Sequence, residues 1–115
     1  MKISFYSQRI DKLYHDDKQL VKKYGLECAK SLAFIRQVLN GIANYKELMS
    51  PPFTKYKFHE LKGDRKHQWG IRLSKSSGVR LVVFLLDKDG VFIKDISRQD
   101  CVCICIKEIG NYHHG

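Results

Sequence analysis

Along the first forty residues, the spacing of hydrophobic positions changes from that of a strand to that of helices. Residues 2–6 alternate between polar and apolar side chains, which predicts a short strand. Apolar residues then recur at helical spacing up to Tyr24, and a second helical pattern covers residues 26–42. Ser7 is a suitable N-cap and Gly25 a suitable stop for the first helix. We therefore expect a strand and then two helices, joined by a short turn into a hairpin.

The second half of the chain has the pattern of successive strands. Residues 44–52 contain both prolines and are interpreted as a short helical turn and a loop. Polar turns at residues 62–66, 74–78 and 87–90 then separate runs with strand spacing, namely residues 56–61, 68–73, 79–86 and 101–109. Residues 91–100 are ambiguous and fit at most a short extension. The run 79–86 is apolar on both faces except for Arg80, which is typical of a central strand.

This order of elements predicts an α+β fold. Short connections between successive strands imply antiparallel pairing, and helices grouped ahead of strands pack together on one face of a sheet. We expect an N-terminal strand and a two-helix hairpin packed on a small, mainly antiparallel β-sheet, with the other sheet face left for a ligand. A chain of 115 residues forms one such domain, residues 1–115.

The composition is that of a globular protein, with 43% hydrophobic and 29% charged residues. The longest nearly apolar run, residues 79–86, is far too short to cross a bilayer. The first residues lack the apolar segment and the small-residue cleavage site of a signal peptide. We expect a cytoplasmic protein without a membrane partner.

The charge balance is strongly basic. The chain has 21 Lys and Arg against 12 Asp and Glu, a net charge of +9. In so small a domain this charge favours a polyanionic partner, and nucleic acid is the usual one. A basic surface kept for solubility and an acidic protein partner are the alternatives.

The cysteines indicate packing rather than metal binding. Cys101, Cys103 and Cys105 alternate with apolar residues, so on a strand all three thiols would share one face and act as small core residues. Zinc sites favour closely spaced cysteine pairs on turns, and Cys28 lies far away in sequence. Phosphate-loop, dinucleotide-binding, HExxH and EF-hand motifs are absent from the sequence. We expect no metal and no cofactor.

Three segments, taken in order, resemble a known toxin family. Residues 58–72 read FHELKGDRKHQWGIR and resemble the L-H-x-L-K-G-x-R-x-x-x-W-x-I-R core of HigB-type toxins, a group of the RelE/ParE toxin superfamily. Residues 79–84, VRLVVF, resemble the family's x-R-I-x-F strand, and residues 108–113, EIGNYH, resemble its terminal D-Y-H. The resemblance is firm over residues 56–86 and 106–113, and over the helices it is one of pattern alone.

The resemblance implies a RelE-like fold with a concave active site, a small sheet and two helices behind it. It also implies the toxin of a type II toxin–antitoxin system, a metal-independent endoribonuclease that cuts mRNA in the A site of the ribosome. The partner implied is an antitoxin similar to HigA, a helix-turn-helix protein.

RNA cleavage without a metal needs a base for the ribose 2′-OH, positive charge for the phosphorane and an acid for the leaving 5′-oxygen. His59 is the first candidate for acid or base, because histidine titrates near neutral pH. Without the resemblance it would be interpreted as a surface histidine of a basic hairpin. By analogy with the family His113 is its functional partner, and the alternative is a mobile C-terminal residue.

Two cations are candidates for contacts with phosphate. Arg80 is a charge in an otherwise apolar strand, and a guanidinium can clamp phosphate with two hydrogen bonds. The alternative for Arg80 is pairing with a carboxylate such as Asp64. Lys62 is a candidate point-charge contact, and its alternative is solvation in the turn.

The remaining candidates would extend the RNA surface. Tyr112 would stack on a base or lend its hydroxyl to the site, unless it packs the C-terminal tail. Three further cations would lengthen the basic surface toward RNA: Arg65, Lys66 and Arg72. Trp69 shares a face with apolar residues and is expected in the core. Two histidines match no catalytic position and are expected at the surface, His15 and His67.

The chain departs from the family pattern in two places. Asn111 stands where many members have aspartate, and an amide can hydrogen-bond but cannot act as a base. The connection formed by residues 87–100 is longer than usual, which would alter docking on the ribosome. Two other functions remain open: a ParE-like inhibitor that binds a topoisomerase, and an RNA- or ribosome-binding module without activity.

Overall fold

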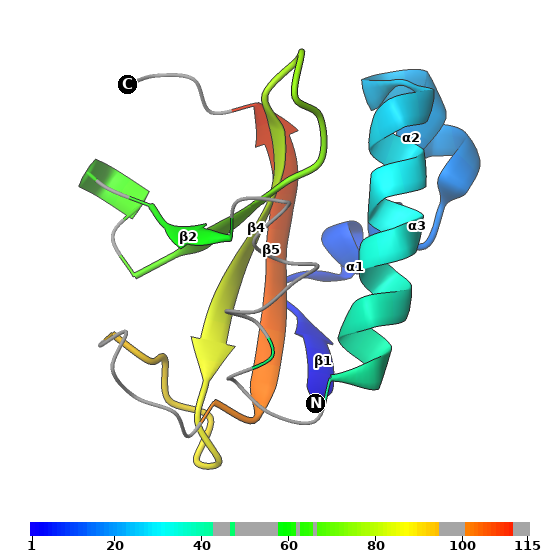
Figure 1. Cartoon of the computed structure of the whole chain (residues 1–115). Coiled ribbons are helices and arrows are strands. Elements are labelled where there is room, and N and C mark those ends of the chain that lie inside the picture. The colour runs from blue at the N-terminus through cyan, green and yellow to red at the C-terminus, as the bar shows by residue number, and fades with distance from the viewer. Residues whose placement is uncertain (43–46, 48–57, 62, 66, 95–100, 112–115) are drawn as a thin grey trace.

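Helices and strands form two layers in the computed structural model, which describes residues 1–42, 47, 58–61, 63–65, 67–94 and 101–111. This part of the chain has three α-helices and a five-stranded mixed sheet, an α+β fold (Figure 1). The elements in chain order are β1 (Lys2–Phe5), α1 (Gln8–Tyr14), α2 (Asp17–Tyr24), α3 (Leu26–Gly41), β2 (His59–Glu60), the 3-10 turn η3 (Gly63–Arg65), β3 (Trp69–Arg72), β4 (Val79–Leu86) and β5 (Cys103–Asn111).

The sheet has the order β1-β5-β4-β3-β2. β1 pairs with β5 in parallel, and the other neighbouring strands pair antiparallel, so the expected mainly antiparallel sheet is confirmed. The parallel pair places the N-terminal strand beside the C-terminal one, with Lys2 opposite Cys103. β4 lies in the middle of the sheet, as its apolar faces predicted.

The expectation of a single first helix was wrong, because that segment forms α1 and α2. α1 ends at Tyr14, and Asp16 begins α2 by accepting a hydrogen bond from the backbone N–H of Gln19 at 3.1 Å. An aspartate that satisfies a free N–H favours a new helix start over continuation of the old one. The outer ends were predicted correctly: Ser7 Oγ accepts from Ile10 N–H at 3.3 Å, and Gly25 ends α2 with a φ of +91°.

Strand boundaries also differ from the sequence pattern. β2 has only two residues among those described. Positions 56 and 57 of the expected strand lie outside the described residues, and Phe58 and Leu61 lie just beyond the two ends of β2. The last strand runs from Cys103 to Asn111, two residues later than expected. Most of the expected turn and loop at 44–52 and the later part of 91–100 lie outside the described residues.

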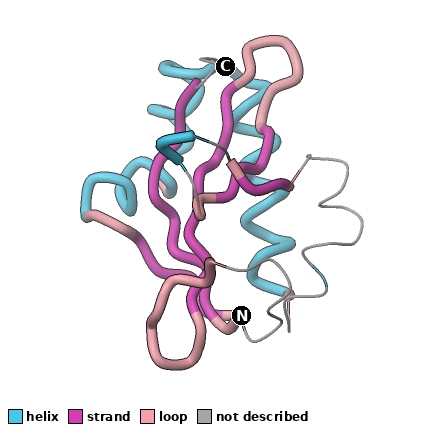
Figure 2. Tube along the Cα trace, turned by 90° about the vertical axis from the view of Figure 1, so that its left-hand side faces the viewer, coloured by secondary structure: helices cyan, strands magenta, loops and turns pink. Residues whose placement is uncertain are grey.

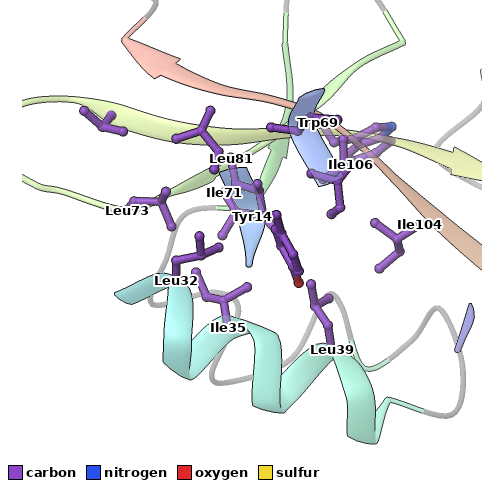
Figure 3. Packing of buried hydrophobic residues seen from close by; sticks show 14 of the residues in the cluster. Tyr14, Leu32, Ile35, Leu39, Trp69, Ile71, Leu73, Leu81, Ile104 and Ile106 are labelled. Carbon is purple, nitrogen blue, oxygen red and sulfur yellow. The ribbon is translucent and has the colours of Figure 1, made fainter. Parts of the chain in front are cut away.

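All three helices lie on one side of the sheet (Figures 1 and 2). Leu32, Ile35 and Leu39 of α3 are buried against sheet residues, including Ile71, Leu81, Ile104 and Ile106 (Figure 3). Trp69 belongs to this core with 1% of its surface exposed, as expected. In the described part of the chain, none of the helices has the length and apolar character needed to cross a membrane.

The four cysteines are buried free thiols, and they do not all share one sheet face. Cys101 packs in the core beneath the helices, whereas Cys103 and Cys105 lie outside that cluster. The expectation of a common face failed because Cys101 precedes the strand, so the alternation of faces begins only at Cys103. Burial raises the pKa of the Cys28 and Cys105 thiols, which keeps them protonated at neutral pH.

Candidate active site on the uncovered sheet face

The face of the sheet turned away from the helices carries a row of cations. Odd-numbered residues of β4 from Val79 to Leu85 belong to the core, so Arg80, Val82 and Phe84 point to the other face. Figure 2 views the molecule from this side, with strands in front of the helices. We call it the uncovered face.

Two arginines lie directly opposite each other on this face. Arg72 of β3 and Arg80 of β4 are Cα partners, and Gly110 of β5 is the next residue in the same row. Both arginines are partly buried, and neither side chain forms a hydrogen bond or an ion pair with the residues that the structure describes. Like charges opposite each other destabilise a sheet. An anion between the two guanidinium groups would remove that repulsion and accept hydrogen bonds from both.

His59 lies on the same face, level with the residues two positions along the strands from the two arginines. Its Cα partner is Gly70 of β3, so His59, Gly70 and Val82 form a row next to the arginine row. Spacings in a sheet place the Cα atoms of His59 and Arg80 about 12 Å apart. A histidine and an arginine can bridge that separation through one phosphate group.

Gly70 leaves the space that the Arg80 side chain uses. A Cβ atom at position 70 would lie 3.6 Å from Arg80 Cδ and 3.1 Å from Leu61 Cδ2. The stem of Arg80 therefore passes beside Gly70, toward the strand that carries His59. Gly110, the partner of Arg80 on β5, has no side chain to place beside it.

The turn between β2 and β3 folds across the uncovered face and is tied to β5. The Arg65 guanidinium of η3 contacts the Glu108 carboxylate and donates to Gln68 Oε1 at 3.3 Å. Lys107 Nζ donates to the same Gln68 oxygen at 3.1 Å. The Glu108 carboxylate is shared, because Lys107 Nζ lies 3.6 Å from the same carboxylate oxygen. Its contact with Arg65 makes that arginine a support for the turn more than a free contact for phosphate.

A β-bulge explains how Lys107 and Glu108, adjacent in sequence, both reach this face. The register shifts between Val82 and Val83, because Val83 pairs with Ile106 and Val82 with Glu108. The extra residue, Lys107, interrupts the alternation of faces. Sequence reasoning missed both residues, since no local signal marks the position of a bulge.

Of the predicted site residues, the structure brings together His59, Arg72 and Arg80, and it places Arg65 in the neighbouring turn. Four predicted residues lie outside the described residues: Lys62, Lys66, Tyr112 and His113. The Asp64 side chain, the expected alternative partner of Arg80, is also outside the described part.

Asn111 has a contact that an aspartate could not make. Its side-chain amide Nδ2 donates to the carbonyl oxygen of Ser77 at 2.5 Å, which joins the end of β5 to the loop between β3 and β4. A carboxylate has no proton to donate to a carbonyl oxygen. The departure from the family pattern therefore coincides with a hydrogen bond that fixes this end of the sheet.

The two histidines assigned to the surface differ. His15 is exposed, with its ring 3.1 Å from Asp11 Oδ1, as expected. His67 does not fit the expectation, because it is only partly exposed and its Nδ1 is buried, 3.7 Å from Glu60 Oε2. It has a φ of +70°, which is uncommon outside glycine, and thus occupies a constrained place in the turn before β3.

Comparison with known proteins identifies no relative: neither a family model, nor a curated protein, nor a solved structure matches the chain significantly. Among the described residues, no group of three or more His, Cys, Asp and Glu side chains is placed to hold a metal ion. The fold and the site together define an α+β protein with a pair of facing arginines and a histidine on an uncovered sheet face.

Proposed function

We propose that this chain is a metal-independent endoribonuclease, the toxin of a type II toxin–antitoxin system, of HigB type within the RelE/ParE superfamily. The observation that carries the proposal is the facing pair Arg72 and Arg80, with His59 in the next row of the same face. The three sequence segments that resemble the family supply the class of toxin. The N-terminal strand, the helices on one face and the mainly antiparallel sheet support a RelE-like fold.

The proposed reaction uses the RNA itself as nucleophile. A base takes the proton from a ribose 2′-OH, the 2′-oxygen forms a bond to phosphorus, and the bond from phosphorus to the 5′-oxygen breaks. An acid protonates that leaving oxygen. The products are a 2′,3′-cyclic phosphate, which water can open to a 3′-phosphate, and a 5′-hydroxyl end.

His59 and His113 share the roles of acid and base in this scheme. Arg80, helped by Arg72, binds the phosphate and balances the charge that develops on the phosphorane. Lys62 adds a second point charge, and Tyr112 holds a neighbouring base or lends its hydroxyl. Lys66 extends the basic surface, and Arg65, which contacts Glu108, supports the turn η3.

The proposed setting is the cytoplasm, in the A site of the ribosome, where the codon of an mRNA is already ordered. Such an ordered substrate supplies part of the geometry that a small enzyme lacks. A net charge of +9 suits a surface that docks on RNA. A HigA-like helix-turn-helix antitoxin would hold the toxin inactive.

The experiment is induced expression with mapping of mRNA 5′ ends, for the wild type and for His59→Ala, Arg80→Ala and His113→Ala. We expect cuts inside translated frames in the wild type and their loss in all three variants. His15→Ala is the matched control, because it removes an exposed histidine at the end of α1, beside Phe5 of β1, and should leave the cuts unchanged. Thermal unfolding of each purified variant checks that the fold is retained.

Growth arrest without mRNA cuts would contradict the ribonuclease. If arrest persists in His59→Ala and Arg80→Ala, a ParE-like topoisomerase inhibitor becomes the better interpretation. If arrest needs Arg80 but not His59, the chain acts as an RNA- or ribosome-binding module.

A further inference from the structure

An aromatic cluster lies on the uncovered face, at the other end of β4 from the arginine pair. The rings of Phe84 and Phe92 are stacked, with centroids 4.2 Å apart and an interplanar angle of 4°. The Tyr6 ring lies 5.7 Å from the Phe84 ring. Phe84 is buried beneath its two neighbours, whereas 60% of Tyr6 and 39% of Phe92 is exposed. One side of Phe92 covers Phe84, so its exposed surface is the opposite ring face and the edge.

Backbone contacts fix the two segments that carry the exposed rings. The Asp87 carboxylate accepts hydrogen bonds from the N–H groups of Asp89 and Val91, which closes the turn after β4. Phe92 then forms a bridge with Leu86 that returns it to the sheet. Tyr6 follows β1, and its N–H donates to Ile106 O at 2.8 Å. Rings that stand on a fixed backbone and pack against Phe84 have less conformational entropy to lose when a ligand binds them.

The cluster is continuous with the cationic surface. Lys107 Nζ lies 5.7 Å from the centroid of the Phe84 ring. Phe84 and Arg80 share the face of β4 and are four residues apart, about 13 Å along the strand. A short stretch of extended single-stranded RNA covers that distance. Aromatic rings beside cations are the usual surface for unpaired nucleotides, because every base has a face that can stack and every phosphate a charge to neutralise.

We propose that Tyr6 and Phe92 form a stacking platform for unpaired bases of an RNA strand whose scissile phosphate lies between Arg72 and Arg80. This inference rests on the proposed RNA substrate and adds a second contact region to it. The platform selects single-stranded RNA, since bases paired in a duplex keep their faces stacked on one another.

The test is equilibrium binding of the full chain to an unstructured RNA of about ten nucleotides, a usual length for single-strand sites. The RNA carries 2′-O-methyl groups, which block the nucleophile, so binding is measured without cleavage. We expect Phe92→Ala and Tyr6→Ala each to raise the Kd by about tenfold. Phe92→Trp and Tyr6→Phe should keep wild-type affinity, because an aromatic face remains.

Val91→Ala is the matched control. Val91 is 55% exposed and adjacent to Phe92, but it has no ring and should leave the Kd unchanged. A second set of RNAs replaces one nucleotide at a time by an abasic unit. For wild type, one or two of these replacements should weaken binding as much as Phe92→Ala does. Phe92→Ala should bind these abasic RNAs as tightly as it binds the intact RNA, because the ring that contacts the missing base is already gone.

Three results would overturn the platform. The first is an unchanged Kd in Phe92→Ala and Tyr6→Ala. The second is that Phe92→Ala weakens the binding of the intact RNA and of every abasic RNA by the same factor. The third is a loss of antitoxin binding in these variants with unchanged RNA affinity, which would assign the cluster to a protein. The probe cannot be cut, so the binding test does not depend on mRNA cleavage. Binding through Phe92 can be established even if the ribonuclease proposal fails, and mRNA cleavage can be established even if the platform proposal fails.

Discussion

The two facing arginines should make the free protein less stable than it would be with one of them neutral. Arg80→Met is the chosen change, because methionine removes the charge and keeps an aliphatic side chain beside Gly70 and Leu61. Arg72 then faces an apolar side chain in place of a second cation. We expect the variant to unfold at a higher temperature than wild type in a buffer without multivalent anions.

The magnitude follows from the register. Cross-strand Cα partners lie about 5 Å apart, and splayed guanidinium groups reach about 8 Å. Repulsion at that separation is about 0.5 kcal/mol in water and about 2 kcal/mol at the effective dielectric of a protein surface. A gain of about 1 kcal/mol corresponds to about 4 °C in a domain of this size.

The assay is thermal unfolding in chloride and in phosphate at equal ionic strength. Phosphate should stabilise the wild type by binding between the arginines, and it should stabilise Arg80→Met much less, because ligand binding to the folded state alone raises stability. Lys88→Met is the control, since it removes the same charge from the exposed turn after β4, at the opposite end of that strand from Arg80. It should respond to phosphate like the wild type.

An equal phosphate effect in all three proteins would refute the reasoning, because general screening would then explain it. A lower unfolding temperature for Arg80→Met in chloride would mean that its packing beside Gly70 contributes more than the repulsion removes.

Three further predictions concern the frame of the site. Asp16→Ala should cost about 1 kcal/mol in urea unfolding through loss of the α2 cap, and Lys18→Ala in the same helix should cost little. Gly70→Ala should cost about 1 kcal/mol and weaken phosphate binding, since its Cβ presses on Leu61 and Arg80; unchanged phosphate affinity would show that Gly70 does not position Arg80. Burial raises the pKa of Tyr14 from 10.0 to about 12. The contribution of this group to the free energy of unfolding is therefore fully present below pH 10. It is lost as the pH rises toward 12, because the phenol ionises in the unfolded chain before it ionises in the folded one. Tyr14→Phe should flatten that alkaline loss, measured by urea unfolding across this pH range.

Local signals predicted most of the element boundaries. Ser7 and Gly25 mark helix ends through contacts within one turn, so their residue types alone were informative. The break at Asp16 had a readable signal too, because Gln19 follows it at the spacing of a capping box. The unbroken run of apolar spacing outweighed that signal, and the boundary was missed.

The candidate site was predicted in part. His59 and Arg80 were identified by residue type and family resemblance, and the β3–β4 hairpin, a local element, sets Arg72 opposite Arg80. Lys107 and the Tyr6–Phe92 platform were missed, since each depends on contacts between distant segments. Tyr6 and Phe92 are eighty-six positions apart, and only their shared contact with Phe84 joins them.

The sequence by itself determined the α+β class and the central place of β4. It also determined that alternate residues of β4 share one face of the sheet. All three follow from the spacing of residue types along the chain. Tertiary structure alone decided which sheet face the helices cover, that β1 joins β5 in parallel, and where the bulge places Lys107 and Glu108. The physical reason is that a strand's alternation fixes two sets of side chains, but the packing of all the layers together selects which set is buried.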